Sequence, residues 1–227
     1  MPVLDLDQEC ICLRKTCLCI NGFSRVIFLD WDDTLLASSA LSKRNLRPYD
    51  HSVFPQDVTE SLEKLEDAVI EFMTLLSSQA SVYIITNSTN GWVELSCHRF
   101  FPRLYPLLEN IPIVSARSLF EHIHPNDPFE WKKNCFQSIF SELAAAHPSF
   151  TFELVSVGDS EGERVGSRYI QSLFPNVIVK CIKLIEYPSM MYLAQQISLL
   201  KSNFFKVLRH GSTLDLNIQV QPVQGKG

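Results

Sequence analysis

Short apolar segments that are rich in β-formers alternate with helical patterns along this chain. The segments cover residues 25–30, 81–86, 111–115, 152–157 and 177–182, and each is short enough to form one buried strand. Longer stretches of helical periodicity separate them. Strands that alternate with helices in this way are typical of a parallel sheet built from β-α-β units. The alternation therefore predicts an α/β fold.

Capping patterns mark where two of the helices begin. Asp57 and Glu60 form a capping box in front of an apolar stripe at helical spacing. Asp127 combines an N-cap with a proline at the first helical position and an acid at the third. A third helix is expected over residues 189–201, and the two apolar segments after it are expected to form a terminal hairpin.

Length, composition and charge exclude several classes of protein. The 227 residues are 46% hydrophobic and 20% charged, which is the balance of a globular domain rather than of a disordered chain. The net charge of −5 argues against a nucleic-acid-binding protein, which needs a strongly basic surface. No apolar stretch approaches the roughly 18 residues of a membrane helix, and no secretion signal is visible. We therefore expect a soluble cytoplasmic protein with no nucleic-acid partner and no transmembrane segment.

Four of the seven cysteines lie close together near the N-terminus, at Cys10, Cys12, Cys17 and Cys19. The odd total and the absent secretion signal argue against a disulfide framework. The alternating apolar pattern favours a hairpin over residues 8–22, in which cysteine serves as a small apolar residue. Two other interpretations stay open, because four thiolates could bind zinc and one or more of them could be acylated.

Acidic and hydroxyl side chains gather where three of the expected strands end. Asp30 closes the first strand and Asp32 follows it, Thr86 closes the second, and Asp159 and Glu163 follow the fourth. Ligands of open parallel sheets bind at the carboxyl ends of the strands. Two neighbouring carboxylate clusters suit Mg²⁺, which prefers oxygen ligands. A plainer interpretation of the same residues is that they form acidic turns that cap helices.

Lys132 is expected to point toward the core of the protein. On the helix that begins near Pro128 it shares one face with four apolar residues, Phe129, Phe136, Ile139 and Leu143. A buried lysine is costly unless it meets negative charge, so we expect an acidic partner. Alternatively, its stem packs on the core while the ammonium group reaches solvent. Lys133 falls at the margin of the apolar face.

The order of these residues resembles the motif pattern of the haloacid dehalogenase superfamily. Residues 30–34, with the sequence DWDDT, resemble its first motif, D-x-D-x-T. Thr86 matches the second motif, Lys132 the third, and the glycine and aspartate at 158–159 the fourth. The resemblance extends over about residues 24–185.

The resemblance implies phosphatase chemistry. Asp30 would be the nucleophile and form an aspartyl-phosphate. Asp32 would protonate the leaving alcohol and then activate the hydrolytic water. Thr86 and Lys132 would hold the phosphoryl oxygens. A second aspartate at the position of Asp32 is typical of the phosphatases in the superfamily and absent from its dehalogenases.

The resemblance also implies a Mg²⁺ cofactor. The ion would lie between the carboxylate of Asp30, the backbone carbonyl of Asp32 and Asp159. Glu163, with Glu161 as a rival, stands where the family more often carries a second aspartate, and is expected to be a further metal ligand. Two more polar residues are expected to bind substrate: Thr34 and Asn87.

The expected architecture is a Rossmann-like parallel sheet with helices on both faces, within a single domain over residues 1–227. Its core would cover about residues 24–203, with the N-terminal hairpin at 8–22 and a C-terminal hairpin at 204–221. The superfamily often inserts a cap domain over the site. Residues 36–56 are too few for such a domain, so we expect a capless protein.

An open site suits a phosphate group that is displayed on a macromolecule. The expected function is therefore Mg²⁺-dependent hydrolysis of a phosphorylated protein, with phosphotyrosine modestly favoured because an aryl phosphate is the easier leaving group. Three cations in the loop could attract such a segment or simply be solvated: Lys43, Arg44 and Arg47. Alternatives are a phosphatase for small metabolites or lipid headgroups and a non-catalytic binding module. Secretion into a host cell, as an effector, and peripheral membrane contact stay open.

Overall fold

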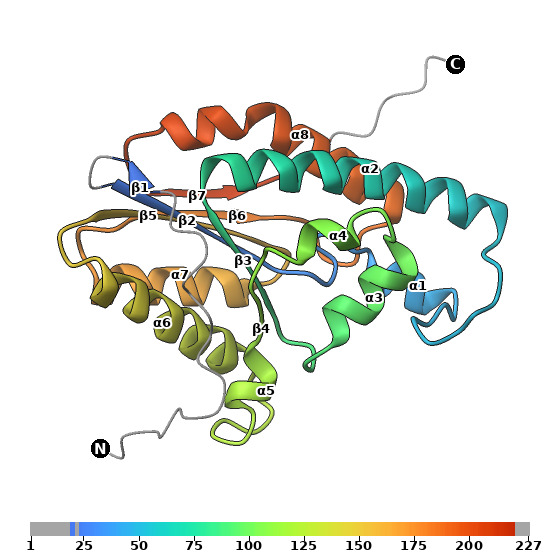
Figure 1. Ribbon diagram of the computed structural model, residues 1–227, viewed down its shortest axis with the longest axis horizontal. Helices are drawn as coiled ribbons and strands as arrows, with labels where there is room; N and C mark the ends of the chain where they lie inside the picture. Colours follow the sequence, from blue (N-terminus) through green and yellow to red (C-terminus); the bar gives the residue numbers. More distant parts are fainter. Residues whose placement is uncertain (1–18, 21–22, 221–227) are drawn as a thin grey trace.

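The computed structural model describes residues 19–20 and 23–220, and its centre is a parallel sheet (Figure 1). Six strands pair in parallel in the order β4-β3-β2-β5-β6-β7. They are β2 (Phe23–Leu29), β3 (Ser81–Thr86), β4 (Ile113–Ser115), β5 (Thr151–Gly158), β6 (Ile178–Lys183) and β7 (Leu214–Asn217). All five strands expected for the sheet are present, within two residues at either end, and β7 joins them from the segment expected to form the second arm of the C-terminal hairpin.

Helices cover both faces of this sheet, as Figure 1 shows. The first face is covered by α2 (Gln56–Gln79) and α8 (Met190–Arg209), and the second by α5 (Ala116–Phe120), α6 (Pro128–Ala146) and α7 (Glu161–Leu173). The shorter α1 (Ser38–Lys43), α3 (Trp92–Phe100) and α4 (Tyr105–Leu108) lie together beyond one end of the sheet. The predicted Rossmann-like α/β arrangement is therefore confirmed.

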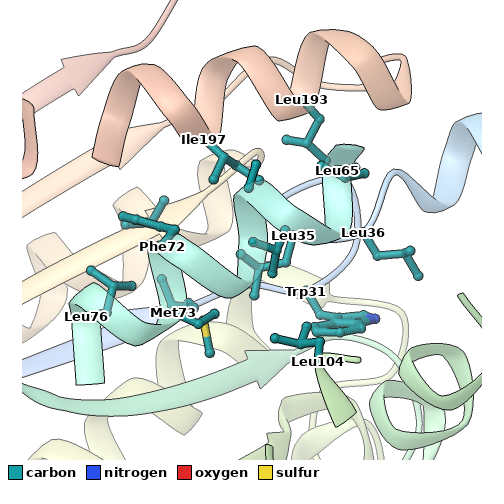
Figure 2. Close-up of a cluster of buried hydrophobic side chains, with 14 of the residues drawn as sticks. Trp31, Leu35, Leu36, Leu65, Phe72, Met73, Leu76, Leu104, Leu193 and Ile197 are labelled. Carbon is teal, nitrogen blue, oxygen red and sulfur yellow. The ribbon is translucent and has the colours of Figure 1, made fainter. Parts of the chain in front are cut away.

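Successive side chains of each strand point to opposite faces of the sheet, so the hydrophobic core consists of two clusters, one on each face. In β2, Ile27 and Leu29 pack toward α2 and α8, whereas Val26 and Phe28 pack toward α6. Figure 2 shows the first cluster, to which the buried ring of Trp31 belongs. Its indole N–H donates to a hydroxyl of α3 (Ser96 Oγ, 2.9 Å). The residue between the two expected catalytic aspartates therefore anchors their loop to the core.

The predicted capping box at the start of α2 is wrong. The helix begins at Gln56, and its N-cap is Pro55, two residues before Asp57, with no side-chain cap bond. The Asp57 carboxylate instead forms an ion pair with Arg44. The carboxylate bonds a cation of the preceding loop, so it is not used to cap its own helix.

The predicted C-terminal hairpin over 204–221 is also wrong. Residues 204–208 form the end of α8, which continues to Arg209 instead of ending near Lys201. Phe204 lies on the apolar face of α8 that packs against α2, and its ring packs edge-on against the ring of Phe72, with 5.6 Å between the ring centroids. The second expected arm contains β7, which joins the sheet parallel to β6 rather than pairing with a preceding arm.

Most of the expected N-terminal hairpin lies outside the described residues. Cys19–Ile20 form β1, which pairs antiparallel with the start of β2. Cys10, Cys12 and Cys17 fall outside the described ranges, so the hairpin, zinc and acylation interpretations stay predictions. Within the described residues, each helix is either too short or too polar to cross a lipid bilayer.

A glycine lets α7 lie close to α6, and this contact gives a stability prediction. Alanine normally stabilises a helix by about 0.5–1 kcal/mol relative to glycine. At Gly166 its Cβ would lie 2.7 Å from the Phe136 ring, and such overpacking costs about 1–3 kcal/mol. The two effects oppose each other, so we expect Gly166→Ala to lower the free energy of unfolding by a net of about 1 kcal/mol. Denaturant unfolding followed by circular dichroism measures this free energy.

Gly211→Ala is the matched control, because nothing lies within 4 Å of its added Cβ. Equal stability of the two variants would contradict the close packing of α7 on α6.

Candidate active site

The carboxyl edge of the sheet gathers the residues that the sequence places in one site. From the central strand β2 the chain passes to β3 and β4 on one side, and it later returns to β5 and β6 on the other. Ligands of open parallel sheets bind where the strand order reverses in this way. Asp30 directly follows β2, Thr86 ends β3, and Asp159 directly follows β5. The sheet therefore brings these three residues to one edge.

A chain of buried ion pairs lies at the end of β2. The backbone N–H of Asp30 donates to the carbonyl oxygen of Val157 at 3.0 Å, which fixes Asp30 to the neighbouring strand β5. Lys132 of α6, only 2% exposed, places Nζ 2.5 Å from Asp30 Oδ1 and forms a second ion pair with Glu163. Burial alone would lower the pKa of Lys132, but the two carboxylates outweigh it and raise that pKa. Lys132 is therefore a fixed cation between two buried carboxylates.

The orientation of α6 confirms one prediction and corrects another. Lys132 points inward as expected, while Lys133 lies nearer the surface and pairs with Glu130. Phe129, expected on the buried face, is 48% exposed. It lies in the first turn of the helix, where Trp131 packs inward instead.

Glu163 caps α7 and partners Lys132 at the same time. Its Oε2 accepts from the backbone N–H of Ser160 at 3.2 Å and from the Ser160 hydroxyl at 2.7 Å, in a capping box. Its Oε1 faces Lys132. Burial opposes ionisation, but Lys132 and Ser160 together lower the pKa of Glu163. A Cβ at Gly158 would collide with this side chain, so only glycine there leaves room for it. Both oxygens of this expected metal ligand are thus engaged by the protein.

Negative charge exceeds positive charge around Asp30. Burial raises the pKa of Asp30 well above its ordinary value, although Lys132 opposes the shift. Burial also raises the pKa of Asp159 to about 7, and the nearby carboxylates of Glu163 and Asp33 add to this effect. The single positive charge of Lys132 does not balance the negative charges of these carboxylates. Carboxylates crowded in this way favour the binding of a further cation.

Asp32 is held toward β3 and α3 by two donors. The Ser88 hydroxyl donates to Asp32 Oδ2 at 2.7 Å, and the indole N–H of Trp92 lies 3.0 and 3.1 Å from its two carboxylate oxygens. Two donors from different segments fix the orientation of this half-buried carboxylate. Its position beside Asp30, two residues away, matches the spacing of the first motif.

The remaining expected site residues also lie at this edge. Thr34 is fully buried, and its hydroxyl lies 3.4 Å from Asp30 Oδ2. Thr86 Oγ1 accepts from the backbone N–H of Ser88 at 3.0 Å. The side-chain amide of Asn87 donates to the carbonyl oxygen of Pro128 at 3.2 Å. This bond ties the end of β3 to the first turn of α6, which carries Lys132, so Asn87 positions that helix.

The sequence did not indicate three residues that hold the side chains or backbone of the candidate site in place. Ser88 and Trp92 hold Asp32, and the ammonium group of Lys183 bonds the backbone carbonyl oxygen of Asp159. Ser88 could have been suspected, because it directly follows the second motif. Trp92 and Lys183 carry no local signal, since both contacts join segments that are far apart in the chain.

Oxygen donors of the kind that Mg²⁺ prefers lie at this edge. Within residues 23–220, no group of three or more histidine, cysteine or acidic side chains is arranged to hold a metal ion. Mg²⁺ commonly takes only one or two carboxylates and completes its coordination with water and substrate phosphate. The carboxylates of Asp30 and Asp159 and the carbonyl of Asp32 are hard oxygen donors of this kind. Together with the surplus of negative charge, they fit a magnesium ion.

Comparison with known proteins adds no relative. No family model, no curated protein and no solved structure matches this chain.

Proposed function

We propose that this protein is a Mg²⁺-dependent phosphatase that hydrolyses phosphomonoesters through an aspartyl-phosphate at Asp30. The observation that carries the proposal is the buried pair of Asp30 and Lys132 at the carboxyl end of the central strand. The pair lies where the strand order reverses, with Thr86 and Asp159 at the flanking strands. The sequence resemblance to the haloacid dehalogenase superfamily supports the same chemistry.

The proposed reaction has two steps. In the first, an Asp30 oxygen forms a bond to phosphorus while the bond from phosphorus to the ester oxygen breaks, and Asp32 gives its proton to that oxygen. In the second, water attacks phosphorus, the bond to Asp30 breaks, and Asp32 takes a proton from the water. Inorganic phosphate leaves, and both aspartates return to their starting states.

Lys132 and Thr86 support these steps through charge and hydrogen bonding. Lys132 offsets the negative charge of Asp30, which lets an anionic phosphate approach an anionic nucleophile. The Thr86 hydroxyl accepts from the backbone of its own loop, so its proton is free to meet a phosphoryl oxygen. Thr34 lies against Asp30 rather than in the open edge, so we assign it to orienting the nucleophile.

The proposed magnesium ligands are Asp30, the backbone carbonyl of Asp32, and Asp159. When bound, the ion would neutralise the carboxylates and polarise the phosphoryl group. We propose that Glu163 is the ion-pair partner of Lys132 rather than a magnesium ligand, because its two carboxylate oxygens already bond Lys132 and Ser160.

The proposed substrate is a phosphorylated protein, with phosphotyrosine favoured. Residues 36–56 form α1 and a loop, which supports an open site. A small-metabolite or lipid-headgroup phosphatase is the second candidate, and a non-catalytic binding module is the third. A buried cation between two carboxylates is costly to maintain without a use, which speaks against the third.

Metal removal tests the proposal. We expect purified protein to release phosphate from 4-nitrophenyl phosphate with Mg²⁺, to lose this activity in excess EDTA, and to recover it when Mg²⁺ is restored. Alkylation with iodoacetamide should leave activity intact, because burial raises the pKa of three cysteines to about 12: Cys97, Cys135 and Cys181. Metal-independent activity that alkylation destroys would contradict the proposal. A panel of phosphopeptides, sugar phosphates and inositides then ranks the substrate classes.

A further inference from the structure

A pocket opens directly beside Asp32. It has a volume of about 230 Å³ and lies between α1, the loop that follows it, and α3, of which it contacts the first and last residues. Trp92, Leu46 and Pro48 contribute apolar walls, and Arg47 contributes a cation. Asp32 itself lines the pocket, and Trp92 both forms a wall and donates to Asp32. The pocket and the expected acid–base residue are therefore parts of one structure.

Arg47 differs from the other two cations of this loop. Arg44 is held in an ion pair with Asp57, and Lys43 lies over the ring of Tyr187, 5.8 Å from its centre. The guanidinium of Arg47 donates to the Ser42 hydroxyl at a long 3.3 Å, and no carboxylate in the described part of the chain pairs with it. Of the three cations in this loop, Arg47 is the one that lines the pocket.

We propose that this pocket receives the aromatic ring of a phosphorylated phenol, so that the protein acts on aryl phosphates such as phosphotyrosine. The inference rests on the proposed function. The ester oxygen must reach Asp32 to receive its proton, so the group attached to that oxygen extends past Asp32. The space there is the pocket.

Size and chemistry favour an aromatic ring as the occupant. An apolar cavity of about 150 Å³ is enough to bind benzene, so a pocket of about 230 Å³ accommodates a phenol ring. The walls from Trp92 and Pro48 offer apolar contact, and the planar guanidinium of Arg47 stacks well on an aromatic face. A short alkyl group such as that of phosphoserine would leave most of these walls without contacts.

Two variants change the pocket without touching the reacting groups. Arg47→Ala removes the cation, and Arg44→Ala is its matched control because Arg44 is bound to Asp57. Ser42→Trp places a large ring at an exposed position that lines the pocket. Ser78→Trp is its matched control, because it places the same ring at an exposed position at the far end of α2, where it does not line the pocket. Because aryl phosphates are intrinsically more reactive than alkyl phosphates, each variant is compared with wild type on the same substrate.

The measurement is kcat/KM for a phosphotyrosine peptide, 4-nitrophenyl phosphate and phosphoserine. We expect Arg47→Ala and Ser42→Trp to lower it about tenfold for both aryl substrates, mainly through KM, and less than twofold for phosphoserine. Both controls should match wild type. Equal losses on aryl and alkyl substrates, or none, would overturn the pocket assignment while leaving the proposed function intact. A larger loss for the peptide than for 4-nitrophenyl phosphate identifies a protein substrate, and equal losses identify the free aryl phosphate.

A binding measurement separates this inference from the proposed function. In calorimetric titrations we expect phenylphosphonate to bind wild type at least tenfold more tightly than methylphosphonate, and Ser42→Trp to remove the difference. Neither compound is hydrolysed by the proposed route, because each has a carbon–phosphorus bond instead of an ester. Absence of turnover on every phosphate ester would contradict the proposed function, whereas equal affinity for the two phosphonates would contradict the pocket.

Discussion

Asp30→Asn will abolish phosphate release while leaving the fold intact. An amide cannot form the bond to phosphorus, so we expect kcat to fall by roughly 10⁴- to 10⁶-fold, as for the loss of other enzyme nucleophiles. Steady-state release of phosphate from 4-nitrophenyl phosphate measures the loss. Thermal unfolding should show a melting temperature equal to or above that of wild type. Burial raises the pKa of Asp30, which means that its ionised form is disfavoured in the folded protein, and the neutral amide removes that cost while Lys132 keeps Glu163 as its partner.

Asp67→Asn is the control for this substitution. Asp67 is an acidic residue of α2 that pairs with Arg103 at the surface, and such exposed pairs contribute little to stability. Its replacement should change neither turnover nor melting temperature appreciably. Normal turnover by Asp30→Asn would remove Asp30 as the nucleophile, and with it the proposed mechanism.

The strands and the inward orientation of Lys132 could be predicted because their signals are local. Each strand is a short apolar run bounded by turn residues, and burial on both faces makes these runs almost continuously apolar. Lys132 lies four residues before Phe136, which places both on one face of α6 wherever the helix packs. Strand-end positions of Asp30, Thr86 and Asp159 followed from the same patterns.

The errors have equally specific causes. The Asp57 cap failed because a cation outside the helix, Arg44, binds the same carboxylate. The C-terminal hairpin failed because its apolar residues were interpreted as a strand, although Phe204 and Leu208 continue the helical spacing that begins at Leu193. In the first case a tertiary contact decided between two structures that local sequence allows, whereas in the second the local helical spacing itself indicated the observed structure.

The functions of Glu163 and Trp92 could not be predicted, because neither depends on local pattern. Glu163 meets Lys132 from a different helix, and Trp92 meets Asp32 across 60 residues of chain. The expectation of a metal ligand at Glu163 came from the resemblance to the haloacid dehalogenase superfamily, whose fourth motif more often carries a second aspartate at this place. In the structure the helix turns its carboxylate inward over Gly158, toward the lysine.

Lys132→Met will lower both the free energy of unfolding and the phosphatase activity, whereas Lys133→Met will leave both nearly unchanged. Removal of the ammonium group leaves Asp30 and Glu163 buried without their cation. Loss of one partner from a buried ion pair typically costs about 3–5 kcal/mol, a large part of the roughly 5–15 kcal/mol that stabilises a domain. Lys133 has 23% of its side chain exposed, pairs with Glu130 three residues away on the same helix, and places its ammonium group 5.1 Å from the centre of the Tyr169 ring. Methionine can still pack on that ring, so the loss of stability should stay within about 0.5 kcal/mol. Chemical unfolding and phosphatase assays measure the two effects.

A double variant separates the two contributions of Lys132. Adding Glu163→Gln to Lys132→Met removes one of the two stranded charges and keeps an acceptor for the capping box, because glutamine serves at that position as well as glutamate. We expect this pair of changes to recover a measurable part of the lost stability but none of the lost turnover, since no cation then faces the phosphate. Recovery of both would mean that Lys132 acts only through the fold. If Lys133→Met lost activity and Lys132→Met kept it, the packing of α6 against the sheet would be wrong, because the side chain at 132 reaches Asp30 only when this helix turns its Phe136 face inward.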